Sequence, residues 1–192
     1  MNRIFFTLAL VSSLMLVAAM GFGLWIGDAA SKDPAEQTIV FRHLFMAFGG
    51  LLVALMVHGL VLTYFMGTGR WMEETSTTYG LDEKWRKENT SLKYRTLPLM
   101  VGTVFLLIAA GAFGAAADPA STVGFQGWLG IPAATWHFLV ATLALGLHLV
   151  ATFVEYFAIV RNGELIEEVM QAVGRIRQEN GLTEPSQQTT AV

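Results

Sequence analysis

The chain has 192 residues, of which 54% are apolar and only 14% charged, against roughly 25% charged residues in soluble domains. This composition excludes an ordinary water-soluble domain. The net charge is −3 and no basic stripe with interleaved aromatic residues is present, so a nucleic-acid partner is not expected. The chain has no cysteine, which excludes a disulfide, a thiolate metal site and a c-type haem attachment.

Four stretches of the sequence are long and apolar enough to cross a hydrocarbon core of about 30 Å. The predicted transmembrane helices cover about residues 4–27, 41–67, 96–117 and 133–160. The first exceeds the roughly 7–15 apolar residues of a signal peptide, so we expect it to be retained. The fourth follows a loop-like segment and has Pro132 at its start, where proline suits a helix. The sequence therefore predicts an all-α integral membrane four-helix bundle over residues 1–161.

Basic residues set the predicted orientation, because Lys and Arg in short loops stay on the cytoplasmic side. Of the 12 basic residues, only Lys32 and Arg42 fall on the opposite side. The others precede the first helix, lie in the loop between helices two and three, or follow helix four (Arg3, Arg70, Lys84, Arg86, Lys87, Lys93, Arg95, Arg161, Arg175 and Arg177). Both termini are therefore predicted to lie inside, with residues 68–95 as an internal loop.

The region after the fourth helix has a different pattern. Asn162 and Gly163 interrupt the apolar run, and apolar residues then recur at helical spacing between charged ones over residues 162–182, which is typical of an amphipathic helix. This cytoplasmic helix has three possible positions: in the membrane interface, on a partner, or on the protein's own internal loop. Residues 183–192 are polar, and we expect them to be disordered. We find no internal repeat.

All four histidines of the chain lie on the second and fourth predicted helices. These helices run in the same direction, so His43 and His137 lie near the outer surface, and His58 and His148 lie roughly 20 Å deeper at 1.5 Å per residue. At about 100° per residue, the two histidines of each helix share one face. The sequence thus predicts two facing pairs of imidazoles, one at each level.

Two imidazoles at one depth on facing helices are the axial ligands that a six-coordinate haem requires. Two levels would hold two haems. Gly50 on helix two and Gly146 on helix four lie between the levels, where glycine gives room for a flat ring. Arg42, beside His43, is a candidate partner for a haem propionate.

This layout resembles the four-helix bundle of di-haem b-type cytochromes, as in the cytochrome b of quinol-oxidising complexes, over about residues 4–160. The resemblance implies a bis-histidine subunit that passes electrons across a bacterial cytoplasmic membrane, within a larger redox complex. It implies haem b as the cofactor and no bond-making chemistry by this chain alone. The histidine separations are 15 and 11 residues, whereas the family's are nearly equal. A single haem between His58 and His148 would avoid that mismatch.

Other interpretations of the same residues stay open. Histidines near a helix end can extend towards the interface, and a buried one can bond a hydroxyl on another helix. Imidazoles also bind copper or zinc, and successive sites would make a metal-ion pathway. A further alternative is a cofactor-free accessory or scaffold subunit, whose amphipathic helix contacts a partner.

Glu155 lies seven residues after His148, on roughly the same face and nearer the inside. With Tyr64 near the same surface, it is a candidate for a site where a quinone exchanges protons and electrons. The structural alternative is that Glu155 pairs with a basic residue at the inner helix ends.

Overall fold

The computed structural model describes residues 1–182. Four long helices, each apolar enough to cross a membrane, make up most of this part of the chain: α1 (Asn2–Trp25), α2 (Pro34–Tyr79), α3 (Lys84–Ala117) and α4 (Ala133–Glu179). Two short strands, β1 (Gly127–Trp128) and β2 (Ile131–Pro132), form a hairpin before α4. The four predicted helices are confirmed, and their length and composition suggest an integral membrane protein. The predicted disordered tail, residues 183–192, lies outside the described residues.

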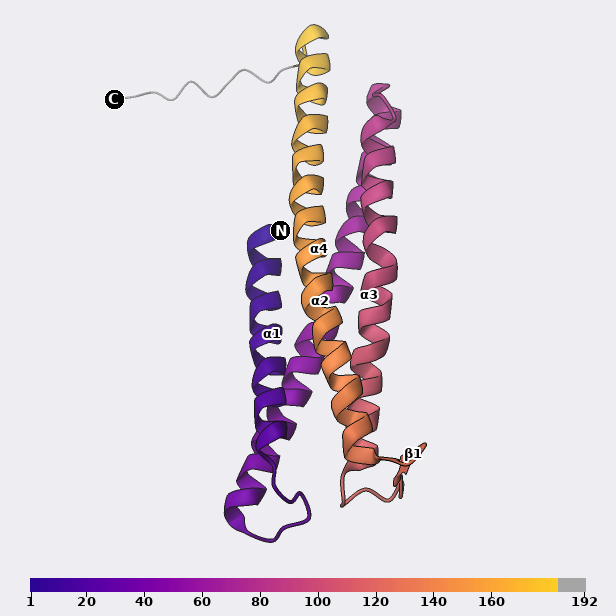
Figure 1. The fold of residues 1–192 in the computed structure, drawn as a ribbon. Helices are drawn as coiled ribbons and strands as arrows, with labels where there is room; N and C mark the ends of the chain where they lie inside the picture. The colour runs from indigo at the N-terminus through magenta and orange to yellow at the C-terminus, as the bar shows by residue number, and fades with distance from the viewer. Residues whose placement is uncertain (183–192) are drawn as a thin grey trace, which may run out of the picture.

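The helices pack as two antiparallel hairpins, α1 with α2 and α3 with α4. The hairpins meet through α2 against α3 and α1 against α4, and α2 also contacts α4 across the bundle. Figure 1 shows that α2, α3 and α4 continue well past the N-terminus of α1. We call this part the three-helix extension (residues 68–79, 84–95 and 162–179). The opposite end, with the connections at 26–33 and 118–132, is the loop end.

The three-helix extension corrects two expectations. Residues 68–95 were expected to be a loop, but all except the turn at 80–83 are helical, and Gly80 ends α2 in the left-handed conformation at φ 63°. The segment after Val160 is no separate helix, since α4 runs unbroken to Glu179. The reason is a shared apolar core that continues along the extension (Met72, Trp85, Leu92, Leu165 and Val169). The amphipathic face of residues 162–179 thus packs on the protein's own helices.

Asn162 joins three helices where the sequence suggested a break. Its side chain is completely buried. The Asn162 Oδ1 atom accepts a hydrogen bond from Asn89 Nδ2 at 2.6 Å, and Asn162 Nδ2 donates to Thr68 Oγ1 at 3.0 Å. A Cβ on Gly69 would stand 2.8 Å from Asn89 Oδ1, so a glycine is needed there. Buried amides paired in this way fix the relative positions of α2, α3 and α4.

A cluster of charged side chains lies at the surface of the same region. Arg161 lies 2.7 Å from Glu88 on α3 and 3.0 Å from Glu168 on α4. Trp85 Nε1 donates a hydrogen bond to Glu168 at 2.8 Å. The Trp85 indole and then the Arg161 guanidinium hold the pKa of Glu168 below its ordinary value. Because these side chains are partly exposed, we regard the cluster as fixing geometry more than adding stability.

Replacing Asn162 by alanine tests the buried amide cluster. Asn162→Ala removes the 2.6 Å acceptor of the buried Asn89 amide and one donor to the half-buried Thr68 hydroxyl, so we expect the free energy of unfolding to fall by about 1–3 kcal/mol. Thermal unfolding in detergent micelles measures this, with Gln171→Ala as the control, because Gln171 is exposed on the same helix. Equal effects of the two substitutions would contradict the assigned role of Asn162.

Candidate functional site

The four histidines meet in two pairs between α2 and α4. His43 and His137 have ring centroids 6.0 Å apart, and we call them the loop-end pair. His58 and His148 have centroids 5.3 Å apart, and we call them the mid-bundle pair. In both pairs the ring planes are nearly perpendicular. The pairing expected from depth and helical face is therefore confirmed, and the unequal separations along the two helices do not prevent it.

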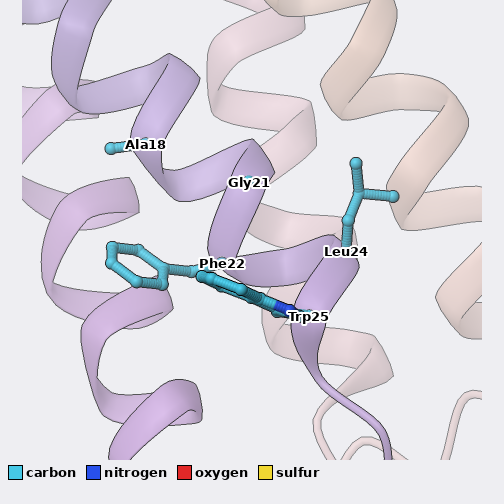
Figure 2. Close-up of a pocket in the computed structure, with 5 residues that line it drawn as sticks. All are labelled: Ala18, Gly21, Phe22, Leu24 and Trp25. Atoms are coloured by element: carbon cyan, nitrogen blue, oxygen red, sulfur yellow. The ribbon is translucent and has the colours of Figure 1, made fainter.

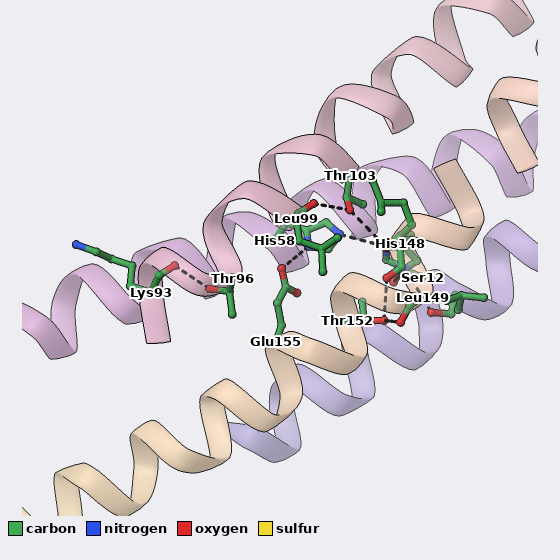
Figure 3. A network of polar contacts seen from close by, with 12 residues as sticks. Ser12, His58, Lys93, Thr96, Leu99, Thr103, His148, Leu149, Thr152 and Glu155 are labelled. Atoms are coloured by element: carbon green, nitrogen blue, oxygen red, sulfur yellow. Dashed lines mark hydrogen bonds and ion pairs between the residues drawn. The ribbon is translucent and has the colours of Figure 1, made fainter. Parts of the chain in front are cut away.

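The mid-bundle pair is part of a continuous hydrogen-bonded chain (Figure 3). His58 Nε2 and His148 Nδ1 are 3.1 Å apart. The other nitrogen of His58, Nδ1, lies 2.8 Å from Glu155 Oε1. The other nitrogen of His148, Nε2, lies 3.3 Å from the hydroxyls of Ser12 and of Ser13 on α1. Both nitrogens of both imidazoles are thus occupied by protein partners.

Glu155 sits inside the bundle and not at a helix end. It is 1% exposed, as is His58, and His148 is completely buried. The structural alternative, in which Glu155 pairs with a basic residue at the helix ends, is wrong, since its ionisable neighbour is His58. The second carboxylate oxygen, Oε2, is buried and has no hydrogen-bond partner among residues 1–182. A buried carboxyl group with one free oxygen is costly to keep charged, and such groups are often functional.

The loop-end pair is held differently. His43 Nδ1 lies 2.9 Å from the carbonyl oxygen of Ala19 on α1, and His137 Nδ1 lies 3.1 Å from that of Ala110 on α3. A carbonyl accepts only, so each ring carries its proton on Nδ1 and keeps a lone pair on Nε2. In the described part of the chain neither Nε2 atom has a hydrogen-bond partner. An Nδ1–H bonded to a backbone carbonyl is the usual second-shell arrangement of a metal-binding histidine.

Two glycines make room for these rings. A Cβ on Gly23 would stand 3.0 Å from His43, and a Cβ on Gly114 would stand 3.0 Å from His137. Each glycine lies four residues after the alanine whose carbonyl bonds the same ring. The segments 19–23 and 110–114 read Ala-Met-Gly-Phe-Gly and Ala-Gly-Ala-Phe-Gly. This Ala-x-x-Phe-Gly repeat on α1 and α3 is the signal that the sequence analysis missed, since it predicts equivalent surroundings for the two rings.

The comparisons with known proteins give no match: no family model, no curated protein and no solved structure matches the chain.

The remaining predicted site residues have other surroundings. Gly50 lies against Leu16 of α1, including its backbone nitrogen, so it serves close helix packing. Gly146 is exposed and would place a Cβ in open space. Arg42 is exposed, next to His43. Tyr64 lies near Asn162, in the direction of the three-helix extension. No hydrogen bond joins Tyr64 to Glu155 in the described residues.

A surface pocket of about 470 Å³ lies at the loop end of α1 (Figure 2). Its lining includes Gly21 and the rings of Phe22 and Trp25, but no charged side chain. Within residues 1–182, no group of three or more His, Asp or Glu side chains is placed to hold a metal ion. A bare metal ion on the loop-end pair would thus have only two ligands from this set, which does not favour the metal-ion pathway.

Replacing Glu155 tests the role of its carboxyl group. Glu155→Leu leaves the buried His58 Nδ1 without an acceptor, so we expect the free energy of unfolding to fall by about 1–3 kcal/mol. Glu155→Gln keeps an oxygen acceptor and should lose clearly less. Thermal unfolding in the same detergent compares the two variants. If glutamine were as destabilising as leucine, the His58 hydrogen bond would not be the stabilising contact.

Proposed function

We propose that the chain is a transmembrane electron-transfer subunit that binds one b-type haem between His43 and His137. The observation that carries the proposal is the surroundings of these two rings: each Nδ1 bonds a backbone carbonyl, and neither Nε2 has a hydrogen-bond partner within residues 1–182. The two rings lie beside each other with centroids 6.0 Å apart, and paired imidazoles on facing helices of a bundle are ligands that a haem iron uses.

The bound haem would supply the one-electron chemistry. His43 and His137 would hold the iron through their Nε2 atoms, and a haem held by two histidines suits electron transfer. The carbonyls of Ala19 and Ala110 orient the two rings, and such second-shell hydrogen bonds raise the basicity of a ligand. Arg42, next to His43 and exposed, offers a guanidinium for a propionate.

The contacts of the mid-bundle pair favour one haem per chain over two, because they leave no ring nitrogen of this pair for iron. The rings of His58 and His148 are hydrogen bonded to each other, and His148 directs Nε2 towards the serines of α1. Iron binding at this level would have to break the contact between the imidazoles. The single haem is thus assigned to the loop-end pair, and not to the mid-bundle pair that the sequence separations favoured.

Membrane orientation and partners belong to the same proposal. Ten of the twelve basic residues lie at the N-terminal end of α1, on the three-helix extension, or directly before it at Arg161. This supports a cytoplasmic position for the end of the bundle that carries the extension, and for both termini. A bacterial cytoplasmic membrane is the membrane we propose. The chain has no cysteine to hold an iron–sulfur cluster as a second redox centre. Its haem would therefore exchange electrons with other subunits of a redox complex or with quinone.

Haem content is the first test of the proposal. We expect about one haem b per purified chain, measured by the absorption spectrum and the pyridine haemochrome. His43→Ala and His137→Ala should each abolish it, whereas His58→Gln and His148→Gln should retain it. Loss of haem on changing His58 or His148 would place the haem site at the mid-bundle pair. If all four variants kept full haem, the assignment of histidine ligands would be wrong. A protein without haem would leave the cofactor-free scaffold subunit as the function.

The glycines that seat the rings allow a sharper comparison. Gly23→Ala and Gly114→Ala place a Cβ 3.0 Å from the rings of His43 and His137. Because outer-shell changes cost about 10–100-fold in affinity, we expect haem affinity to fall by that factor. Gly146→Ala is the matched control, since its Cβ meets open space. Titration of the apoprotein with haem gives the three affinities, and equal values would contradict the seating of the rings.

A further inference from the structure

The hydrogen bonds at the middle of the bundle form an unbroken path from α1 to α4 (Figure 3). We propose that Ser13, His148, His58 and Glu155 are a proton-transfer chain, which takes up a proton on the α1–α4 side and holds it on Glu155. Successive heavy atoms along the path are 3.3, 3.1 and 2.8 Å apart. The two inner distances lie within the range of direct proton transfer, and the 3.3 Å step from Ser13 must shorten slightly when a proton passes.

An imidazole suits such a path because it accepts a proton on one nitrogen and releases another from the second. His148 bonds Ser13 through Nε2 and His58 through Nδ1. His58 in turn bonds His148 through Nε2 and Glu155 through Nδ1. Each ring therefore has one nitrogen facing the entrance and the other facing the carboxyl group.

Ser12 and Ser13 can each hydrogen bond one form of His148, with Nε2 protonated in the first case and unprotonated in the second. Ser12 Oγ donates to the Ala9 carbonyl at 3.0 Å, so towards His148 it can only accept, as it must when Nε2 carries a proton. Ser13 Oγ has no other partner among the described residues, so it is free to donate, as it must when Nε2 has a lone pair. The end of the chain is thus hydrogen bonded before and after a proton passes.

The transfer balances in atoms and charge. The hydroxyl proton of Ser13 moves to His148 Nε2 as Ser13 Oγ takes a proton from a donor in the pocket that Ser13 lines between α1 and α4, and the Nδ1 proton of His148 moves to His58 Nε2. The Nδ1 proton of His58 then moves to Glu155 Oε1. One proton has entered, both imidazoles are again neutral with their protons on Nε2, and the carboxylate has become a neutral carboxylic acid. Reversal of these transfers releases the proton, so no oxidant or reductant is required.

Glu155 is the storage end because its carboxyl group is the last proton acceptor on the path and is closed off from solvent. The group is 1% exposed, and its Oε2 has no partner within residues 1–182. The titratable groups that contact this path are His58 from α2 and His148 from α4. The side chains that α1 and α3 present here are hydroxyls, from Ser12, Ser13 and Thr103.

A pocket of about 400 Å³ gives access to the entrance of the chain. It lies between α1 and α4. Its lining is aromatic and aliphatic, with Phe6 and Phe153 among its residues, apart from the hydroxyls of Ser13, Thr152 and Tyr156. Because Ser13 both lines the pocket and contacts His148, a proton donor in the pocket reaches the first member of the chain. No charged side chain lies in this lining, which keeps the entrance neutral.

The test follows protonation of Glu155 in the full-length protein by time-resolved infrared spectroscopy after an acid jump. The carbonyl band that disappears in Glu155→Gln identifies the group. We expect this band to form at least about tenfold more slowly in His58→Gln and in His148→Gln, because a positioned proton-transfer group is typically worth about 10²–10⁴ in rate. Glutamine keeps hydrogen bonding but cannot relay a proton. The rate should therefore fall, whereas the final amplitude of the Glu155 carbonyl band should persist.

Thr103→Val is the control, because Thr103 is buried in the same region and bonds only backbone carbonyls. Its rate should equal that of the wild type. Unchanged rates in both glutamine variants would overturn the proposal, as would the absence of any carbonyl band that depends on Glu155 across the pH range. The proposal does not depend on haem at the loop-end pair. It requires His58 and His148 to be free of iron, so loss of haem in either glutamine variant would overturn it and would reassign the haem site.

Discussion

The contact between His58 and His148 is the constraint on which the rest of the bundle depends. Two imidazoles 3.1 Å apart fix how far α2 lies from α4 and in what register, because a buried polar pair has few acceptable geometries. With that register set, Glu155 reaches His58 from α4 and the serines of α1 reach His148. Further along the same two helices, His43 and His137 come to face each other. One polar contact thus positions both levels.

The two levels differ in what surrounds the rings and not in the rings themselves. At the loop end, backbone carbonyls occupy one nitrogen of each ring and leave the other for a metal, which is the second-shell pattern of a ligand. At mid-bundle, side chains occupy all four nitrogens, which is the pattern of a relay. The proposed division into electron transfer at the loop end and proton transfer at mid-bundle rests on these partners. Proximity of the two levels in one bundle would let each event change the electrostatic energy of the other.

The sequence predicted the four apolar helices and the pairing of the histidines. The length of an apolar stretch and the rise of a helix can both be calculated from residue numbers alone. It failed for the three-helix extension, where charged side chains obscured a core that includes Met72 and Trp85. Asn162 was misread, because Asn-Gly usually ends a helix and its hydrogen-bond partners, Thr68 on α2 and Asn89 on α3, are distant in the sequence. The Ser13–His148–His58–Glu155 chain depends on side-chain rotamers, which spacing does not specify. The Ala-x-x-Phe-Gly repeat was visible and would have identified the seats of the loop-end rings.

The most direct measurement is solid-state nitrogen NMR of the lipid-reconstituted protein with ¹⁵N-labelled histidine. The account predicts that one pair of imidazoles, assigned by its loss in His58→Gln, shows nitrogen–nitrogen coupling through a shared hydrogen bond. It predicts that the other pair shows the large shifts of nitrogens bound to haem iron. Four iron-bound histidines, or a His58–His148 pair without coupling, would contradict the separation of the two levels.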